Sequence, residues 1–134
     1  MCFSLPVAVL YLLGRPPVMS LSPLWPSPQE RAYRREVGAR PVLTDEEFYA
    51  RFYKGSGLPP DIPTKVRRCL ADLDMLIERA YPADVIASAY DDLDFYDVLF
   101  RIERQFGIRF TEEDYPQFTG TLGNLIDRVH DRLR

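Results

Sequence analysis

Beyond Ser27, apolar side chains recur every three or four residues along the chain, with polar side chains between them. This spacing is that of an amphipathic α-helix. The C-terminal stretch predicts a helix over about 121–133, with apolar positions at Leu122, Leu125, Ile126, Val129 and Leu133. A second stretch predicts a helix over about 63–80, with apolar positions at Val66, Cys69, Leu70, Leu73, Leu76 and Ile77. No period-two alternation is long enough for a strand, so we expect an all-α protein.

Residues that start and stop helices divide the first part of the chain. The sequences SPQE (27–30) and TDEE (44–47) have the form of capping boxes, in which a Ser or Thr hydroxyl binds a backbone N–H of the first turn. Gly38 should end the first helix, and the glycines at 55 and 57 the second. The second helix carries four aromatic side chains in i, i+4 pairs: Phe48, Tyr49, Phe52 and Tyr53.

The stretch between the two long periodic segments predicts a loop, a helix and a short turn. Residues 82–91 are expected to form a loop anchored by the apolar side chains of Val85 and Ile86. A helix follows over about 92–106, and Gly107 is its left-handed stop. The sequence TEED (111–114) is expected to cap one short helical turn before the C-terminal helix.

These elements suggest three parts: a Pro-rich leader (1–26), a helical extension (27–60) and a helical domain (61–134). The apolar run FSLPVAVLYLL (3–13) is too short to span a bilayer. It also lacks the preceding Lys or Arg of a signal peptide. We expect the leader to be disordered or extended; a targeting segment, or a true start at Met19, are the alternatives.

Charge and cysteine content indicate which kinds of partner and which cellular compartment fit this chain. The 134-residue chain carries a net charge of -3, with a mildly basic part before residue 60 and an acidic part after residue 91. This distribution favours a basic protein partner and argues against nucleic acid. The two cysteines form no metal or redox motif, and we expect Cys69 to be a buried apolar residue. A reduced, cytoplasmic setting fits this composition.

One stretch carries a resemblance to a known family. DDLDFYDVLFRIERQFGIRF (91–110) and TEEDYPQFTGTLGNLI (111–126) resemble acyl carrier proteins in the order and spacing of their motifs. The matching residues are Asp91, Leu93, Asp94, Glu103, Phe106, Gly107, Ile108 and Phe110. For residues 61–134, the resemblance implies a four-helix bundle with three longer helices and one short helix.

The departure from the family is Asp92, which occupies the position of the serine that carries 4'-phosphopantetheine. That transfer needs an alcohol nucleophile, which a carboxylate does not provide. We therefore expect no cofactor on this chain, and expect Asp92 to cap the helix that it begins. Ser88, four residues upstream, is in the predicted loop and is not assigned the missing role. The alternative is a working carrier with 4'-phosphopantetheine on another serine.

The apolar side chains of the helix over 92–106 cover too wide an arc for one buried stripe. Phe95, Val98, Leu99, Ile102 and Phe106 are the expected core face. A second face corresponds, as the resemblance implies, to the surface by which carrier proteins bind their enzymes. The predicted partner-binding residues are Leu93, Tyr96, Asp97, Phe100 and Glu103. This face is either open or covered by the helix that carries Phe48 and Phe52, and we favour the covered arrangement.

No other chemistry stands out. The carboxylates of DDLD and Asp97 lack calcium-loop spacing, so no metal site is predicted. His130 is expected to be a solvated helix-end residue, and no catalytic constellation is present. We expect a monomeric, non-enzymatic protein-interaction module that avoids membranes and nucleic acid, with a carrier-system enzyme as one candidate partner. The alternatives are a fatty-acid, polyketide or peptide carrier, and a regulatory protein without a carrier-system partner.

Overall fold

The computed structural model describes residues 27–73, 75–89 and 92–134, and the side chains of 92–94 are outside this description. Five α-helices lie within these ranges: α3 (Pro28–Gly38), α4 (Asp45–Phe52), α5 (Asp61–Cys69), α6 (Asp92–Phe106) and α7 (Leu122–Leu133). Three short 3-10 helices join them: η1 (Ile77–Arg79), η2 (Ile86–Ala89) and η3 (Tyr115–Gln117). A single antiparallel bridge between Val85 and Thr121 is the only β pairing in these ranges, so the all-α prediction is confirmed.

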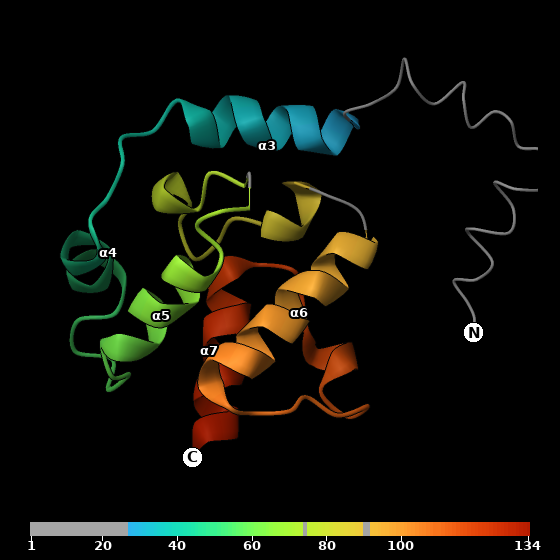
Figure 1. Ribbon diagram of the computed structural model, residues 1–134. Helices are drawn as coiled ribbons and strands as arrows, with labels where there is room; N and C mark the ends of the chain where they lie inside the picture. The colour runs from blue at the N-terminus through green and yellow to red at the C-terminus, as the bar shows by residue number, and fades with distance from the viewer. Residues whose placement is uncertain (1–26, 74, 90–91) are drawn as a thin grey trace, which may run out of the picture.

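The helices α5, α6 and α7 pack around a common core (Figure 1). Their buried faces follow the predicted period: Val66 and Leu70 come from α5 and its end, Ile102 from α6, and Ile126 and Val129 from α7. These side chains are almost completely removed from water, which is the main stabilising term in a domain of this size.

The extension forms a second layer on this bundle. α3 lies across η2, and α4 packs against α5 (Figure 1). The predicted starts explain both helices, whereas α3 includes Gly38 and has Ala39, whose backbone is right-handed, as its C-cap, so Gly38 is not the left-handed stop that was predicted. The Ser27 hydroxyl accepts from the Glu30 N–H, and Thr44 and Glu47 form a complete capping box.

The predicted helix over 63–80 is wrong in its second half. α5 begins at Asp61 and ends at Cys69, and Leu76 has a left-handed φ of 55°. Tertiary contacts account for this difference, because the segment after α5 pairs with the extension. The buried Tyr33 hydroxyl donates to the Met75 carbonyl at 2.7 Å, and the Leu43 N–H donates to the Glu78 carbonyl at 3.0 Å. A continued helix would keep the Met75 carbonyl in its own hydrogen bond with the Arg79 N–H.

The boundaries of α6 and α7 follow the sequence closely. α6 has the predicted bounds, Gly107 follows it with φ 67°, and the Thr121 hydroxyl caps α7. Two apolar predictions were less accurate. Phe106 is only partly buried, and Val85 is 44% exposed, so Ile86 and Ala89, not Val85, anchor the loop into the core.

The aromatic stripe of α4 covers α5, not α6. Phe48 is fully buried, and the Arg67 guanidinium of α5 lies 4.6 Å from its ring centre. The Phe52 ring lies 5.2 Å from that of Tyr81, in the segment after η1. Our preference for a covered face at 93, 96 and 100 was therefore wrong: α4 finds its apolar partners on the opposite side of the bundle, and Tyr96 and Phe100 are exposed.

Candidate protein-docking face

Three exposed aromatic residues lie over α6 and η3. Tyr96 and Phe100, one helical turn apart on α6, are 58% and 54% exposed, and Tyr115 of η3 is 42% exposed. The rings of Tyr96 and Tyr115 lie 6.2 Å apart at an interplanar angle of 74°. This edge-to-face geometry is favourable between aromatic rings. We call Tyr96, Phe100 and Tyr115 the α6 aromatic face.

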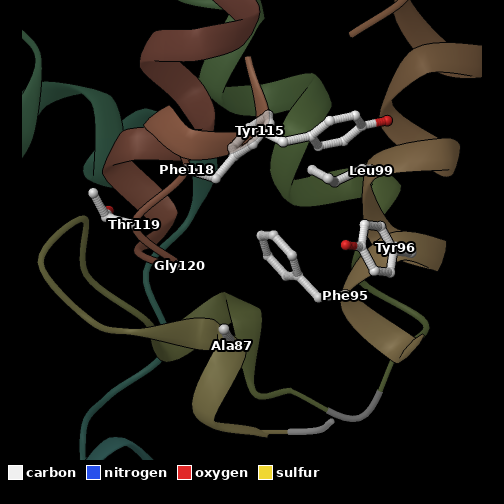
Figure 2. Close-up of a pocket in the computed structure, with 8 residues that line it drawn as sticks. All are labelled: Ala87, Phe95, Tyr96, Leu99, Tyr115, Phe118, Thr119 and Gly120. Carbon is white, nitrogen blue, oxygen red and sulfur yellow. The ribbon is translucent and has the colours of Figure 1, made fainter. Parts of the chain in front are cut away.

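A cavity of about 340 Å³ opens beside this face, between α6 and the segment that follows η3 (Figure 2). Figure 2 shows side chains from α6 on one wall and the 115–120 segment on the other, with the Phe95 ring projecting between them. The Phe95 and Phe118 rings meet edge-on at 6.3 Å. The lining residues are Ala87, Phe95, Tyr96, Leu99, Tyr115, Phe118, Thr119 and Gly120.

The helical wall of the cavity is rigidly supported. Val98 and Ile102 are fully buried in the core, and Leu99, also buried, lines the cavity, so α6 is fixed with its remaining side toward the solvent. Arg101 donates to Asp72 at 2.8 Å and also contacts Asp97 at 3.4 Å, which links α6 to the turn after α5. The α6 aromatic face is therefore presented on a well-packed helix.

The second wall is held by polar contacts from α7. Arg132 donates to the buried Asp114 carboxylate, which also accepts from the Thr111 N–H at 2.7 Å. Asn124 accepts from the Thr119 N–H at 2.9 Å and donates to the Gln117 carbonyl at 3.1 Å. These bonds fix both ends of the segment that carries Tyr115 and Phe118.

Charged groups border the face on both sides. Arg104 lies over the Phe100 ring at 5.6 Å, and Asp97 is exposed next to Tyr96 in the sequence. Burial, and then the negative charge of Glu103, raise the pKa of Tyr115, so its hydroxyl stays protonated at neutral pH. The face thus offers neutral aromatic rings with a border of mixed charge.

The predicted partner-binding residues have different environments. Tyr96, Asp97 and Phe100 are exposed, as an accessible docking face requires. Glu103 is partly buried, and its carboxylate accepts from the Phe110 N–H at 2.7 Å. This bond closes the chain after Gly107, so Glu103 has a structural contact within the fold. The side chain of Leu93 is outside the described residues.

Asp92 is the first residue of α6, as the sequence predicted for the helix over 92–106. The α6 backbone begins at Asp92, whose side chain is outside the described residues, so its capping role stays a prediction. Ser88 lies in η2, is partly buried, and donates its backbone N–H to the Val85 carbonyl at 3.0 Å.

The remaining candidate chemistry is sparse. Within the described ranges, no three His, Cys, Asp or Glu side chains are grouped as metal ligands. His130 lies partly buried in the last turn of α7, and Cys69 is a free, partly buried thiol whose pKa is raised by burial. None of the helices in this part of the chain has the length and apolarity needed to cross a membrane.

Sequence reasoning missed the second wall of the cavity. Tyr115 and Phe118 are spaced three residues apart, as on one side of a helical turn, and Phe118 packs at 90° against the Phe110 ring. That spacing was an available signal, but only one short turn was predicted there. No protein-family model, curated protein or solved structure matches this chain.

Proposed function

We propose that this chain is an acyl-carrier-like protein without the phosphopantetheine attachment serine, and that it acts as a non-enzymatic protein-interaction module. The observation that carries the proposal is the α6 aromatic face. Tyr96 and Phe100 are both more than half exposed on a rigid helix and are extended by Tyr115. Grouped exposed aromatic side chains are typical of protein-binding surfaces.

The order of the elements supports the acyl-carrier-like part of the proposal. A helix, a long connection, a second long helix, a short turn and a last helix follow one another over residues 61–134. This is the order that the motif resemblance implies, although α5, with nine residues, is shorter than the long first helix of that layout. Asp92 at the start of the second long helix supports the loss of the attachment function, since an aspartate has no hydroxyl to form the phosphodiester.

The chemistry of the face indicates how a partner would bind. Burying Phe100 and Tyr96 in a partner's apolar groove would supply most of the affinity, because a few central aromatic residues dominate typical interfaces. Asp97 at the border would favour a cationic group beside that groove and would mainly increase the association rate. The expected partner therefore presents an apolar groove bordered by Lys or Arg.

Affinity capture with paired variants tests the proposal. Phe100→Asp places a carboxylate in the α6 aromatic face, and Val42→Asp makes the same change at an apolar residue that is 50% exposed in the extension. We expect Phe100→Asp to lose the proteins retained from a native extract by the immobilised parent chain. Val42→Asp should retain them. Identical retention by both variants, with unchanged melting temperatures, would reject the α6 aromatic face as the docking site.

Intact mass tests the attachment part separately. Co-expression with a phosphopantetheinyl transferase should leave the mass of the parent chain unchanged. A phosphopantetheine adduct mapped to Ser88 or another serine would instead support a working carrier. This measurement does not depend on the identity of the partner.

A further inference from the structure

The exposed side of α6 carries charges that complement each other when the helix is reversed. Measured along the helix axis from Phe100, Asp97 lies about 4.5 Å toward the N-terminus and Arg104 about 6 Å toward the C-terminus. Both are rotated to the same side of Phe100, by about 60° and 40° around the axis. Two copies of α6 that face each other antiparallel would therefore bring Asp97 of each copy opposite Arg104 of the other.

Both charged groups are available for such a contact. The Asp97 side chain is 58% exposed, and its contact with Arg101 is long, at 3.4 Å. Arg104 is exposed and lies over the Phe100 ring. Among the residues that the structure describes, no carboxylate pairs with the Arg104 guanidinium. The positive charge at the edge of the α6 aromatic face is thus held by a ring and not by a carboxylate.

The opposite side of Phe100 has a similar arrangement. Tyr96 lies one turn before Phe100 and Glu103 almost one turn after it, both rotated away from Asp97. The Glu103 carboxylate accepts from the Phe110 N–H, and a carboxylate can accept further hydrogen bonds. In an antiparallel pair, the Tyr96 hydroxyl of each copy would face Glu103 of the other copy as a donor.

Charge also decides between the two possible orientations. A parallel pair would place Asp97 opposite Asp97 and Arg104 opposite Arg104, and such like-charge contacts weaken association. The antiparallel pair replaces both with contacts of opposite sign. Its two-fold axis passes near Phe100, so that both copies use the same patch of surface.

The α6 aromatic face is accessible and of modest size. Figure 1 shows α6 crossing in front of α7, with none of the described elements in front of it. Tyr96, Phe100 and Tyr115 are each about half exposed and together offer roughly 300 Å² per copy, or about 600 Å² for a pair. Interfaces below about 1,200 Å² are typical of weak, transient complexes. At low concentration we therefore expect the monomer predicted from the sequence.

We propose that the α6 aromatic face binds a second copy of this chain, with the two α6 helices antiparallel and Asp97 of each copy paired with Arg104 of the other. Arg104 supplies the cationic border expected of a partner. Self-association would use the docking surface of the proposed function and rests on it in that respect. A different protein partner would have to displace the second copy.

The molar mass of the purified full-length chain tests self-association. Measured by sedimentation equilibrium, the mass should rise from 15.5 kDa toward twice that value as the concentration increases from micromolar to about 1 mM. Phe100→Asp places two carboxylates near the two-fold axis and should keep the chain monomeric throughout. The matched control, Val42→Asp, should associate as the parent does.

Charge reversal tests the orientation. Asp97→Arg and Arg104→Asp each replace two opposite-charge contacts with two like-charge contacts and should weaken association about tenfold or more. The double variant Asp97→Arg/Arg104→Asp exchanges the signs and should restore it. Asp61→Arg is the control for the change in net charge, because the Asp61 side chain is 63% exposed on α5. Helix content is compared for all variants.

Each outcome decides the proposal. A parent chain that remains monomeric at about 1 mM would overturn it. Association that Phe100→Asp leaves unchanged would assign the contact to another surface, which also overturns it. If both single charge variants lose association and the double variant does not regain it, the antiparallel pairing is wrong.

Affinity capture separates this proposal from the proposed function. If the parent chain is monomeric but retains another protein through Phe100, self-association is rejected and the proposed function stands. If the chain associates through Phe100 and retains no other protein, self-association stands and docking of a different protein is rejected.

Discussion

Two helices of this protein carry aromatic residues at nearly the same spacing, yet one set is largely buried and the other is exposed to solvent. In α4, Phe48 is fully buried and Tyr53 nearly so, and their rings lie 5.9 Å apart. In α6, Tyr96 and Phe100 are more than half exposed. Helical periodicity of aromatic residues therefore predicts a face, but does not decide whether that face is buried.

The polar groups around each set explain the difference. Arg67 lies over Phe48 and donates to Asp45 at 2.8 Å and to the Leu43 carbonyl at 2.8 Å. It therefore joins α5 to the chain just before α4. The α6 aromatic face has Arg104 over Phe100, but none of the described residues joins that face to another helix in this way. The buried Arg67 guanidinium binds backbone carbonyls and so holds the aromatic rings of α4 against α5. None of the described residues makes such a contact at the α6 aromatic face, which stays accessible to solvent.

Truncating one phenylalanine in each region should give the largest contrast. Phe48→Ala removes a fully buried ring and should cost about 3–5 kcal/mol of unfolding free energy, as for other buried aromatic truncations. Phe100→Ala should change it by at most about 0.5 kcal/mol, because the ring is largely in water. Urea unfolding measures both, and similar losses would show that the two faces are not different in burial.

Replacing Arg67 should give the next largest effect. The Arg67 side chain is 5% exposed, and Arg67→Met would leave the Leu43 carbonyl without this donor, whereas the Glu78 carbonyl keeps the Leu43 N–H. Unsatisfied buried acceptors cost about 1–3 kcal/mol, whereas Asp45, at 26% exposed, can still reach water. The matched control is Arg68→Met, since Arg68 also contacts Asp45 but is 74% exposed. Equal unfolding free energies for the two variants would contradict the assigned role of Arg67.

The sequence contained enough information for the local parts of this fold. α6 and α7 were predicted almost to the residue because Thr121 and Gly107 provide local starts and stops. The aromatic pair Tyr96 and Phe100 was also identified as a separate face from its angular position on the helix. These features depend on neighbouring residues along one helix, which a single sequence displays directly.

The parts that failed depend on residues distant in sequence. α5 ends at Cys69 because the segment around Met75 and Glu78 satisfies groups on Tyr33 and Leu43, more than thirty residues earlier. The surface that the aromatic side chains of α4 cover depends on the same tertiary contacts. The cavity needs a wall from residues 115–120, whose position is fixed by Arg132 and Asn124 of α7. Helical periodicity does not show which residues distant in sequence will contact each other.

A matched pair of glycines tests how tightly the second wall of the cavity is packed. Gly120 and Gly107 both have positive φ, at 89° and 67°, so alanine should cost about 1–2 kcal/mol of backbone strain at either. A Cβ at Gly120 would also lie 3.1 Å from the Ala87 Cβ, whereas Gly107 has open space. We expect Gly120→Ala to be the more destabilising in thermal unfolding. Equal losses would mean that the wall moves freely.

Acid should weaken the contacts that hold the second wall of the cavity. The expected change in the free energy of unfolding is smaller than for the substitutions above. Burial alone would raise the pKa of Asp114, but hydrogen bonds from Arg132 and Thr111 outweigh it and hold that pKa below its ordinary value. A depressed pKa in the folded state gives stability that is fully present above the unfolded pKa of about 4. That stability is lost as pH falls through the lower, folded value. The bonds that fix η3 should therefore weaken only in strong acid.

Two substitutions at this contact make the acid effect specific. Asp114→Asn removes the titrating group, so its unfolding free energy should fall less steeply below about pH 4 than that of the parent. Arg132→Gln leaves the Asp114 carboxylate without its cation, so burial should then raise the pKa in the folded state. The variant should be less stable than the parent at neutral pH, and the acid-dependent loss contributed by Asp114 should shrink or reverse. Urea midpoints measured across this range, together with the NMR signals of the Tyr115 ring, follow both stability and the wall itself. If the parent and Asp114→Asn have the same acid slope, Asp114 does not hold η3. The α6 aromatic face would then depend on other contacts, among them those of Asn124 and Arg128 with Gln117, to keep Tyr115 beside Tyr96.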